Sequence, residues 1–188
     1  LGLKKNKNEI NLKLLKKNKS ELKIIIEKIN EYLCLHLKNQ INAGADIVQV
    51  FDSWAGLIPN QNLHDFCYLP NKKIVDFCKK KKTPVICFPR GLNKEYLKFT
   101  KKVKPDCINL DYEIDPVWAK ENLKNVCIQG GMDPKILFKS ENEILSEVDR
   151  YFNIFKKSSY IFNLGHGLLP QTNPNILKKV IKRVGNFK

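Results

Sequence analysis

The chain has 188 residues, 43% of them hydrophobic, and carries 34 basic against 19 acidic side chains. This length corresponds to one domain or to a piece of a larger one, and the apolar fraction excludes a disordered or collagen-like protein. No apolar run approaches the roughly 20 residues of a membrane-spanning helix, and the N-terminal lysines are not followed by the apolar region of a signal peptide. We therefore expect a cytoplasmic protein with no membrane partner.

Short apolar runs alternate with helical periodicity along the chain, which predicts βα units and an α/β fold with a parallel sheet. The lysine-rich residues 1–20 form a segment of uncertain structure, and the folded part is expected over residues 21–188. The predicted strands are 46–51, 84–88, 107–110, 126–129 and 160–164. The predicted helices are 22–42, 63–80 with a break near Pro70, 94–100, 116–123 after the Asp115 cap, one that Ser140 and Glu143 cap, and 174–184 after Asn173.

Apolar side chains in two of these helices recur at steps of three and four residues, which predicts one buried face for each helix. In the helix over 22–42 the recurring residues are Ile25, Ile26, Ile29, Leu33, Leu37 and Ile41. In the helix after Ser140 they are Leu145, Val148, Phe152 and Phe155.

Each predicted strand is followed by polar or glycine residues, and the carboxyl ends of parallel strands are where α/β proteins place their chemistry. These residues are Asp52-Ser53, Arg90-Gly91, Asp111, Gln129-Gly130-Gly131 and Gly165-His166-Gly167. About five strands do not close an eight-stranded barrel, which typically takes ~250 residues, and the chain begins with Leu1 rather than methionine. We therefore expect a partial (β/α)8 TIM barrel that lacks its first strands.

The formal net charge of +15 would ordinarily suggest nucleic-acid binding. However, Arg90, Arg150 and Arg183 are the only arginines, and arginine is the residue that pairs bidentately with phosphates and guanines. The lysines are spread along the whole chain, which favours a solvated surface and no nucleic-acid partner. A positive field could instead attract a polyanionic small molecule.

The six cysteines contain no Cys-x-x-Cys pair of the kind that binds zinc. The nearest arrangement is His64-x-x-Cys67, which lies inside a predicted helix and is a weak signal for a ligand pair. Cys87, Cys107 and Cys127 lie inside apolar runs, so we expect small buried side chains and no metal site.

Three ordered segments carry a family resemblance: residues 48–56 (Val-Gln-Val-Phe-Asp-Ser-Trp-Ala-Gly), residues 128–134 (Ile-Gln-Gly-Gly-Met-Asp-Pro), and residues 162–167 (Phe-Asn-Leu-Gly-His-Gly). The last is followed by Pro170 and Thr172. Together they resemble the C-terminal part of the uroporphyrinogen decarboxylase family, from about residue 24 onward.

The resemblance implies a (β/α)8 enzyme of haem biosynthesis, a carboxy-lyase. That family converts uroporphyrinogen III to coproporphyrinogen III by removing carbon dioxide from four acetate side chains, without a metal or organic cofactor. The resemblance also implies a homodimer in the complete protein.

Two residues match the family's substrate-binding positions. Ser53 matches the strand-end residue whose hydroxyl contacts a substrate carboxylate, although a serine there could also simply cap a turn. His166 matches the C-terminal histidine that lies against substrate side chains, and Gly165 and Gly167 would allow a ligand close to its backbone. The alternative for His166 is a hydrogen bond to a neighbouring loop.

Four further residues are candidates for the pocket: Phe51, Asp52, Arg90 and Asp111. Phe51 either flanks the pocket or belongs to the core, and Asp52 orients the neighbouring serine or a backbone amide. Arg90 could pair with a carboxylate, or be a solvent arginine. Asp111 faces the same strand ends or caps a loop, and Trp54 is expected to pack.

The chain also departs from the family. An arginine-rich N-terminal motif, a pyrrole-binding aspartate and a tyrosine before the long helix have no counterpart here, and Gly131 replaces the usual asparagine. Because the missing groups hold the substrate and stabilise the transition state, the catalytic residues are not identified and the isolated chain is expected to be inactive.

Two other functions would predict different residues or properties. Cobalamin-linked methyltransferases of the same fold bind zinc through histidine and cysteine at strand ends, which this chain does not offer. A lysine-rich nucleic-acid-binding protein would show strongly salt-dependent binding. An incomplete barrel would expose unpaired strand edges and apolar faces, so we also expect poor solubility of the chain by itself.

Overall fold

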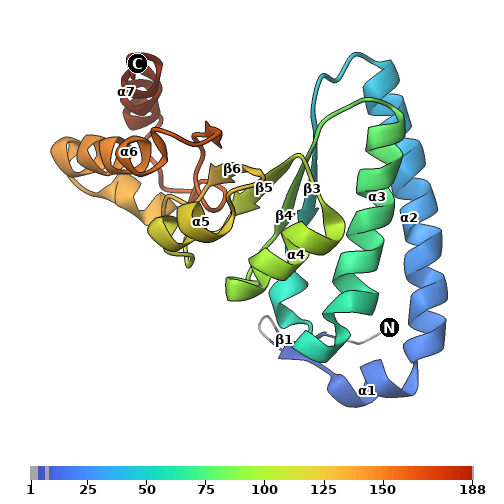
Figure 1. Ribbon diagram of the computed structural model, residues 1–188. Helices are drawn as coiled ribbons and strands as arrows, with labels where there is room; N and C mark the ends of the chain where they lie inside the picture. Colours follow the sequence, from blue (N-terminus) through green and yellow to red (C-terminus); the bar gives the residue numbers. More distant parts are fainter. Residues whose placement is uncertain (1–3, 7–8, 188) are drawn as a thin grey trace. The chain divides into compact units, whose positions relative to one another are not determined.

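The computed structural model describes residues 4–6 and 9–187, and the chain divides into two units, Leu1–Asp106 and Cys107–Lys188 (Figure 1). The first unit contains β1 (Lys4–Asn6), β2 (Glu9–Ile10), α1 (Leu12–Lys17), α2 (Lys19–Asn42), β3 (Val48–Asp52), the 3-10 turns η1 (Ala55–Leu57) and η2 (Asn60–Asn62), the π-helix η3 (His64–Tyr68), α3 (Leu69–Lys80), β4 (Val85–Pro89), the 3-10 turn η4 (Asn93–Glu95) and α4 (Tyr96–Val103). The second unit contains β5 (Cys107–Leu110), α5 (Pro116–Asn122), β6 (Cys127–Gly130), the 3-10 turn η5 (Pro134–Phe138), α6 (Glu141–Phe155), β7 (Tyr160–Ile161) and α7 (Pro174–Gly185).

In the first unit β3 and β4 pair in parallel, in a register that runs from Val48 opposite Val85 to Asp52 opposite Pro89. Helices α2 and α3 lie side by side (Figure 1), and Lys73 Nζ lies 2.8 Å from Glu27 Oε1 between them. Every residue of β4 is buried, as is usual for a parallel strand covered on both faces. The unit therefore positions the carboxyl ends of two strands at one edge.

In the second unit β5 pairs in parallel with β6, and β6 pairs in parallel with β7. The register places Cys107 opposite Cys127 and Ile128 opposite Tyr160. Its core combines strand residues with one face of α6, namely Ile108, Ile128, Ile144, Val148, Tyr151 and Phe155. This core fixes β5, β6 and β7, and the polar and glycine residues that come next in the chain lie at the carboxyl ends of these strands.

The prediction of about five parallel strands with flanking helices is confirmed, an α/β fold consistent with a partial (β/α)8 barrel. The predicted break near Pro70 takes the form of the π-helix η3, which ends just before α3. Proline has no N–H to donate within a helix, so the hydrogen-bond pattern changes at this point.

Three details of the prediction were wrong. The strand predicted over 160–164 ends at Ile161, because the Asn163 side chain accepts the Leu164 N–H at 2.8 Å, and Leu164 then forms an isolated bridge with Met132. The buried face of α6 is Ile144, Val148, Tyr151 and Phe155, whereas Leu145 and Phe152 are only half-buried. Cys127 is also half-buried, as is Cys34.

The single buried face predicted for the first long helix is also not what the structure shows. Helix α2 buries Leu22, Asn30 and Leu37, but Ile25 and Ile29 are exposed. The apolar face of this helix is therefore only partly covered, because Leu22 and Leu37 are buried while Ile25 and Ile29, on the same broad face, are exposed.

The capping box of α6 should carry a measurable share of stability. The Ser140 side chain accepts the Glu143 N–H, and a Glu143 carboxylate oxygen accepts the Ser140 N–H at 3.0 Å. We expect Ser140→Ala to lower the free energy of unfolding by about 1 kcal/mol in denaturant titrations. Ser146→Ala, at an exposed position of the same helix, should not lower it. Equal losses from both substitutions would contradict this role.

Candidate functional site

The turns after β3 and β4 are held together by their backbones. The Arg90 N–H donates to the Asp52 carbonyl at 3.1 Å, and the Gly56 N–H donates to the Arg90 carbonyl at 2.8 Å. A Cβ on Gly56 would lie 2.4 Å from the Gly91 carbonyl oxygen, so only glycine permits this approach. Ser53 lies in the turn fixed in this way, and its side chain is exposed.

The Asp52 side chain accepts a hydrogen bond from the side-chain amide of Asn71 on α3. Asn71, which is 4% exposed, donates through Nδ2 to Asp52 Oδ2 at 3.0 Å and to the Cys67 carbonyl at 2.9 Å. Burial raises the pKa of the Asp52 carboxyl, against the opposing effect of its hydrogen bonds to Asn71 and Cys67. Burial is also the main cause that raises the pKa of the Cys67 thiol, with the Asp52 charge adding to it. Cys67 is therefore an unreactive packing partner and not a nucleophile.

The aromatic residues at this edge are open to solvent. Phe51 is 67% exposed and contacts Phe88 edge-on, with ring centroids 6.2 Å apart, so it does not belong to the core. Trp54 is 52% exposed. Arg90 is half-buried, and among the residues that the structure describes its guanidinium has no hydrogen bond or ion pair. This edge therefore offers a hydroxyl, a guanidinium and aromatic surface to a ligand.

In the second unit a glycine lets the His166 segment lie against the end of β5. A Cβ on Gly165 would lie 2.4 Å from the Tyr112 nitrogen and 2.8 Å from the Asp111 carbonyl carbon. The Gly165 N–H donates to the Met132 carbonyl at 2.8 Å, which ties the same segment to the residues after β6. The position of His166 is therefore set by backbone contacts on both sides.

The His166 side chain is exposed, and its described ring contact is with Tyr112, at a centroid distance of 6.5 Å and an interplanar angle of 63°. Asp111 is 2% exposed, and its Oδ1 accepts the Glu113 N–H at 3.0 Å, so it caps the turn after β5. An exposed imidazole beside a tyrosine can donate a hydrogen bond to a carboxylate in either ring-nitrogen state.

The glycines at the carboxyl end of β6, Gly130 and Gly131, are supported by side chains that the sequence pattern did not single out. The Tyr151 hydroxyl donates to the Gly131 carbonyl at 2.7 Å, and the Tyr160 hydroxyl donates to the Gly130 carbonyl at 3.0 Å. Burial raises the pKa of Tyr151 to about 12 and raises that of Tyr160 further, so both phenols are neutral donors. Gly130 and Gly131 have φ values of +80° and +97°, which other residues rarely adopt.

The predicted site residues fall into two groups. Phe51, Asp52, Ser53 and Arg90 lie together at the edge of the first unit, and Asp111 and His166 lie together in the second. Sequence reasoning missed Asn71, which follows Asp52 by 19 residues and is brought to it only by the packing of α3. It also missed Asn109, whose Oδ1 accepts from buried Gln129 at 2.7 Å.

Two further findings concern the described residues, 4–6 and 9–187. No group of three or more histidine, cysteine, aspartate or glutamate side chains is placed to hold a metal ion there. His64 is exposed while Cys67 is fully buried, so they do not form a ligand pair. No helix in these ranges has the length and apolar character required to cross a bilayer.

Comparison with known proteins identifies the family of this α/β chain. The chain matches the family model for uroporphyrinogen decarboxylase over residues 2–187, which includes the lysine-rich N-terminal residues. It therefore belongs to the uroporphyrinogen decarboxylase family.

Curated relatives agree with this assignment. Proteins named uroporphyrinogen decarboxylase from Cereibacter sphaeroides and Orientia tsutsugamushi are 33% and 36% identical over 164 and 170 residues. These matches cover 85% and 87% of this chain, but 48% and 50% of the relatives. The relative from Paracoccus denitrificans, 33% identical over 163 residues, gives the same coverage as the Cereibacter protein. The chain thus spans about half the length of the curated relatives it matches.

The close approach at Gly165 gives a testable contrast within one loop. Gly165→Ala should lower the free energy of unfolding by about 1–3 kcal/mol, because the new methyl group meets backbone atoms that cannot move aside. Gly167→Ala should change it by less than about 0.5 kcal/mol, since no atom lies within 4 Å of that Cβ position. Denaturant titrations of both variants test this, and a tolerated Gly165→Ala would refute the backbone constraint.

The raised pKa of Asp52 predicts a pH dependence of stability. A buried carboxyl that binds its proton more tightly when folded loses stability as the pH rises above its ordinary pKa of 3.8. The free energy of unfolding of Asp52→Asn, relative to that of the native chain, should therefore increase as the pH is raised from below 3.8 toward neutrality.

Asp65 provides a control of opposite sign. Lys19 and Lys23, each with Nζ 2.9 Å from Asp65 Oδ2, lower the pKa of that carboxyl. Asp65→Asn should become less stable relative to the native chain over the same pH range. Urea titrations at several pH values measure both differences, and trends of equal sign would contradict the assignment.

Proposed function

We propose that this chain supplies part of a uroporphyrinogen decarboxylase, the part that carries the family's C-terminal motifs. The complete enzyme would convert uroporphyrinogen III to coproporphyrinogen III in haem biosynthesis, and the isolated chain would be inactive. The observation that carries the proposal is the family match over residues 2–187. The names of the curated relatives support it, and they are about twice as long as the region matched.

The proposed chemistry needs no metal or organic cofactor. The bond between the acetate methylene carbon and the carboxyl carbon breaks, and carbon dioxide leaves. The electron pair remains on the methylene carbon and is delocalised into the protonated pyrrole of the substrate. Protonation of that carbon gives a methyl group, and the pyrrole then releases the proton that it had taken up, so one proton is consumed for each carbon dioxide lost. The protein has to hold a macrocycle that carries many carboxylates, stabilise the pyrrole cation and supply protons. A net charge of +15 favours the capture of such a polyanion.

In this proposal Ser53 and His166 bind substrate carboxylates. Both side chains are exposed, and both follow carboxyl ends of parallel strands in backbone turns that glycine contacts hold in place. A hydroxyl and an imidazole can each donate a hydrogen bond to a carboxylate without an unusual protonation state. Their exposure in the described structure leaves them accessible to a ligand.

The other candidates would act at the margin of the pocket. Phe51 would provide apolar surface, and the Arg90 guanidinium would pair with a carboxylate. Asp52 and Asp111 would hold the turns, since both accept hydrogen bonds within their own units, Asp52 from Asn71 and Asp111 from a backbone N–H. Neither aspartate needs to contact the substrate for this role.

We further propose a cytoplasmic enzyme that forms a homodimer when complete and binds no nucleic acid. The zinc methyltransferase alternative predicts bound zinc, which elemental analysis of the purified protein would detect. The nucleic-acid alternative predicts salt-dependent binding to duplex DNA or RNA, which a titration at physiological salt would reveal.

Reconstitution tests the proposed activity. The chain would be mixed or co-expressed with the segment of the Orientia tsutsugamushi relative that it does not span, and incubated anaerobically with uroporphyrinogen III. Chromatography of the oxidised products should show coproporphyrin. Failure to form it in a folded complex of the two parts would overturn the proposal.

Variants of the same complex test the two binding residues. We expect Ser53→Ala and His166→Ala each to lower kcat/KM by roughly 10- to 150-fold, because a hydrogen bond to a charged group contributes about 1.5–3 kcal/mol. Ser146→Ala and His64→Ala, at exposed positions outside both strand-end groups, serve as matched controls and should leave kcat/KM unchanged. Activity that is equal in all four variants would remove Ser53 and His166 from the site.

A further inference from the structure

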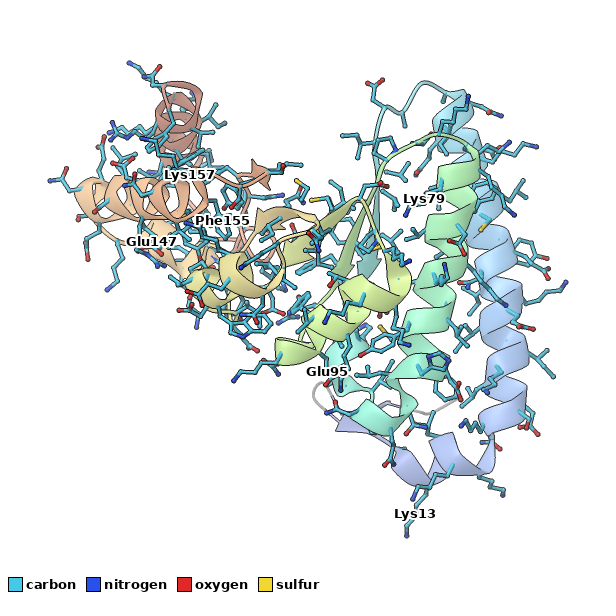
Figure 2. All side chains as sticks on the ribbon, viewed as in Figure 1. Lys13, Lys79, Glu95, Glu147, Phe155 and Lys157 are labelled. Atoms are coloured by element: carbon cyan, nitrogen blue, oxygen red, sulfur yellow. The ribbon has the colours of Figure 1, made fainter. Side chains whose placement is uncertain are left out.

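A pocket of about 170 Å³ lies in the first unit, between α2 on one wall and η3 with the start of α3 on the other. Helices α2 and α3 run side by side (Figure 1), and their side chains meet between them (Figure 2). Two ion pairs among the lining residues join the walls. Lys23 Nζ lies 2.9 Å from Asp65 Oδ2, and Lys73 Nζ lies 2.8 Å from Glu27 Oε1. The walls of the pocket are therefore held at a fixed separation.

The remaining lining is apolar apart from one amide. Ile26, on the α2 wall, packs against the buried cluster that includes Leu22, and Leu69 and Pro70 line the other wall. Asn30, which is 6% exposed, donates through Nδ2 to the Pro70 carbonyl at 3.1 Å and so also joins the walls. A cavity of roughly 150 Å³ can hold a benzene-sized molecule, so this pocket has room for an apolar body of about six carbon atoms.

The charges at the pocket are not balanced. Lys19 and Lys23 each place Nζ 2.9 Å from the same oxygen, Asp65 Oδ2, so two ammonium groups share one carboxylate. Lys73 and Glu27 pair one to one. A second carboxylate can therefore pair with Lys23 while Lys19 continues to neutralise Asp65. The Asp65 end of the pocket favours an anion over a cation.

The pocket is separate from the strand-end residues. Asn71 lies on the side of α3 that faces β3, where it donates to Asp52 at 3.0 Å. Leu69 and Lys73 are each two residues from Asn71, which places them about 200° around the helix from it. Leu69 is 41% exposed, in agreement with a position on the outer side of the helix. The pocket is therefore not part of the site to which Ser53 belongs.

We propose that this pocket binds a small carboxylic acid with an apolar body of about six carbon atoms. The carboxylate of the ligand pairs with Lys23, and its apolar body lies against Ile26, Leu69 and Pro70. A cationic ligand of the same size is repelled by the two ammonium groups, and an uncharged one forms no ion pair. The inference goes beyond the proposed function and does not depend on it.

Titration of the 188-residue chain with hexanoate tests this site. NMR spectra of the isoleucine and leucine methyl groups should show selective, saturable shifts at Ile26 and Leu69. Hexylamine has the same number of carbon atoms and the opposite charge, and it should bind roughly tenfold more weakly. Hexanol, which is uncharged, should lie between the two. This comparison uses the native chain and requires no variant to fold.

Removal of one charge locates the carboxylate. Lys23→Gln should weaken hexanoate binding about fivefold, the upper range for an exposed ion pair, while Lys19 keeps Asp65 paired. Lys28→Gln is the matched control, because Lys28 pairs with Glu31 on the same helix and lies about 140° around it from Lys23. The control should bind hexanoate within about twofold of the native chain. Circular dichroism should show that both variants are folded.

The outcomes separate this site from the proposed activity. Absence of a saturable shift at Ile26 and Leu69 would overturn the site. Equal affinities for hexanoate and hexylamine, or equal losses in Lys23→Gln and Lys28→Gln, would overturn it as well. Hexanoate binding that depends on Lys23 would support it, whether or not the reconstituted complex decarboxylates uroporphyrinogen III.

Discussion

Within each unit, two backbone segments approach each other more closely than a side chain would allow. The candidate site depends on these close approaches. Gly56 meets Gly91 where β3 and β4 end, and Gly165 meets the backbone of Tyr112 after β5. These contacts determine where the exposed Ser53 and His166 leave the strands. The glycines of the sequence motifs therefore have a steric role, and the polar residues beside them are available for a ligand.

Local features could be predicted from the sequence because they depend on neighbouring residues. Ser140 and Glu143 form the capping box that their spacing indicated, and Asp115 caps α5 by accepting the Trp118 N–H at 2.7 Å. The strand Cys107–Leu110 was predicted with the bounds that it has. Short β-branched runs and capping residues carry this information within a few positions.

Features that depend on distant partners could not be predicted. Periodicity could not show that α2 would bury Leu37 and expose Ile29, because both belong to the same apolar pattern and only the neighbouring elements decide. The support of Asp52 by Asn71 likewise exists only once α3 packs behind β3. Which side chains of α2 and β3 are exposed depends in the same way on the elements that pack against them, and not on the local pattern.

The central claim is that His166 binds a tetrapyrrole carboxylate, and the chain has only three histidines with which to test it. Isotope labelling of histidine in the reconstituted complex, followed by NMR titration with coproporphyrin III, would resolve His36, His64 and His166 separately. The account predicts a selective, saturable shift of the His166 imidazole signals, while those of the exposed His36 and His64 stay in place. Saturable binding that leaves the His166 signals unmoved, or that shifts all three equally, would contradict it.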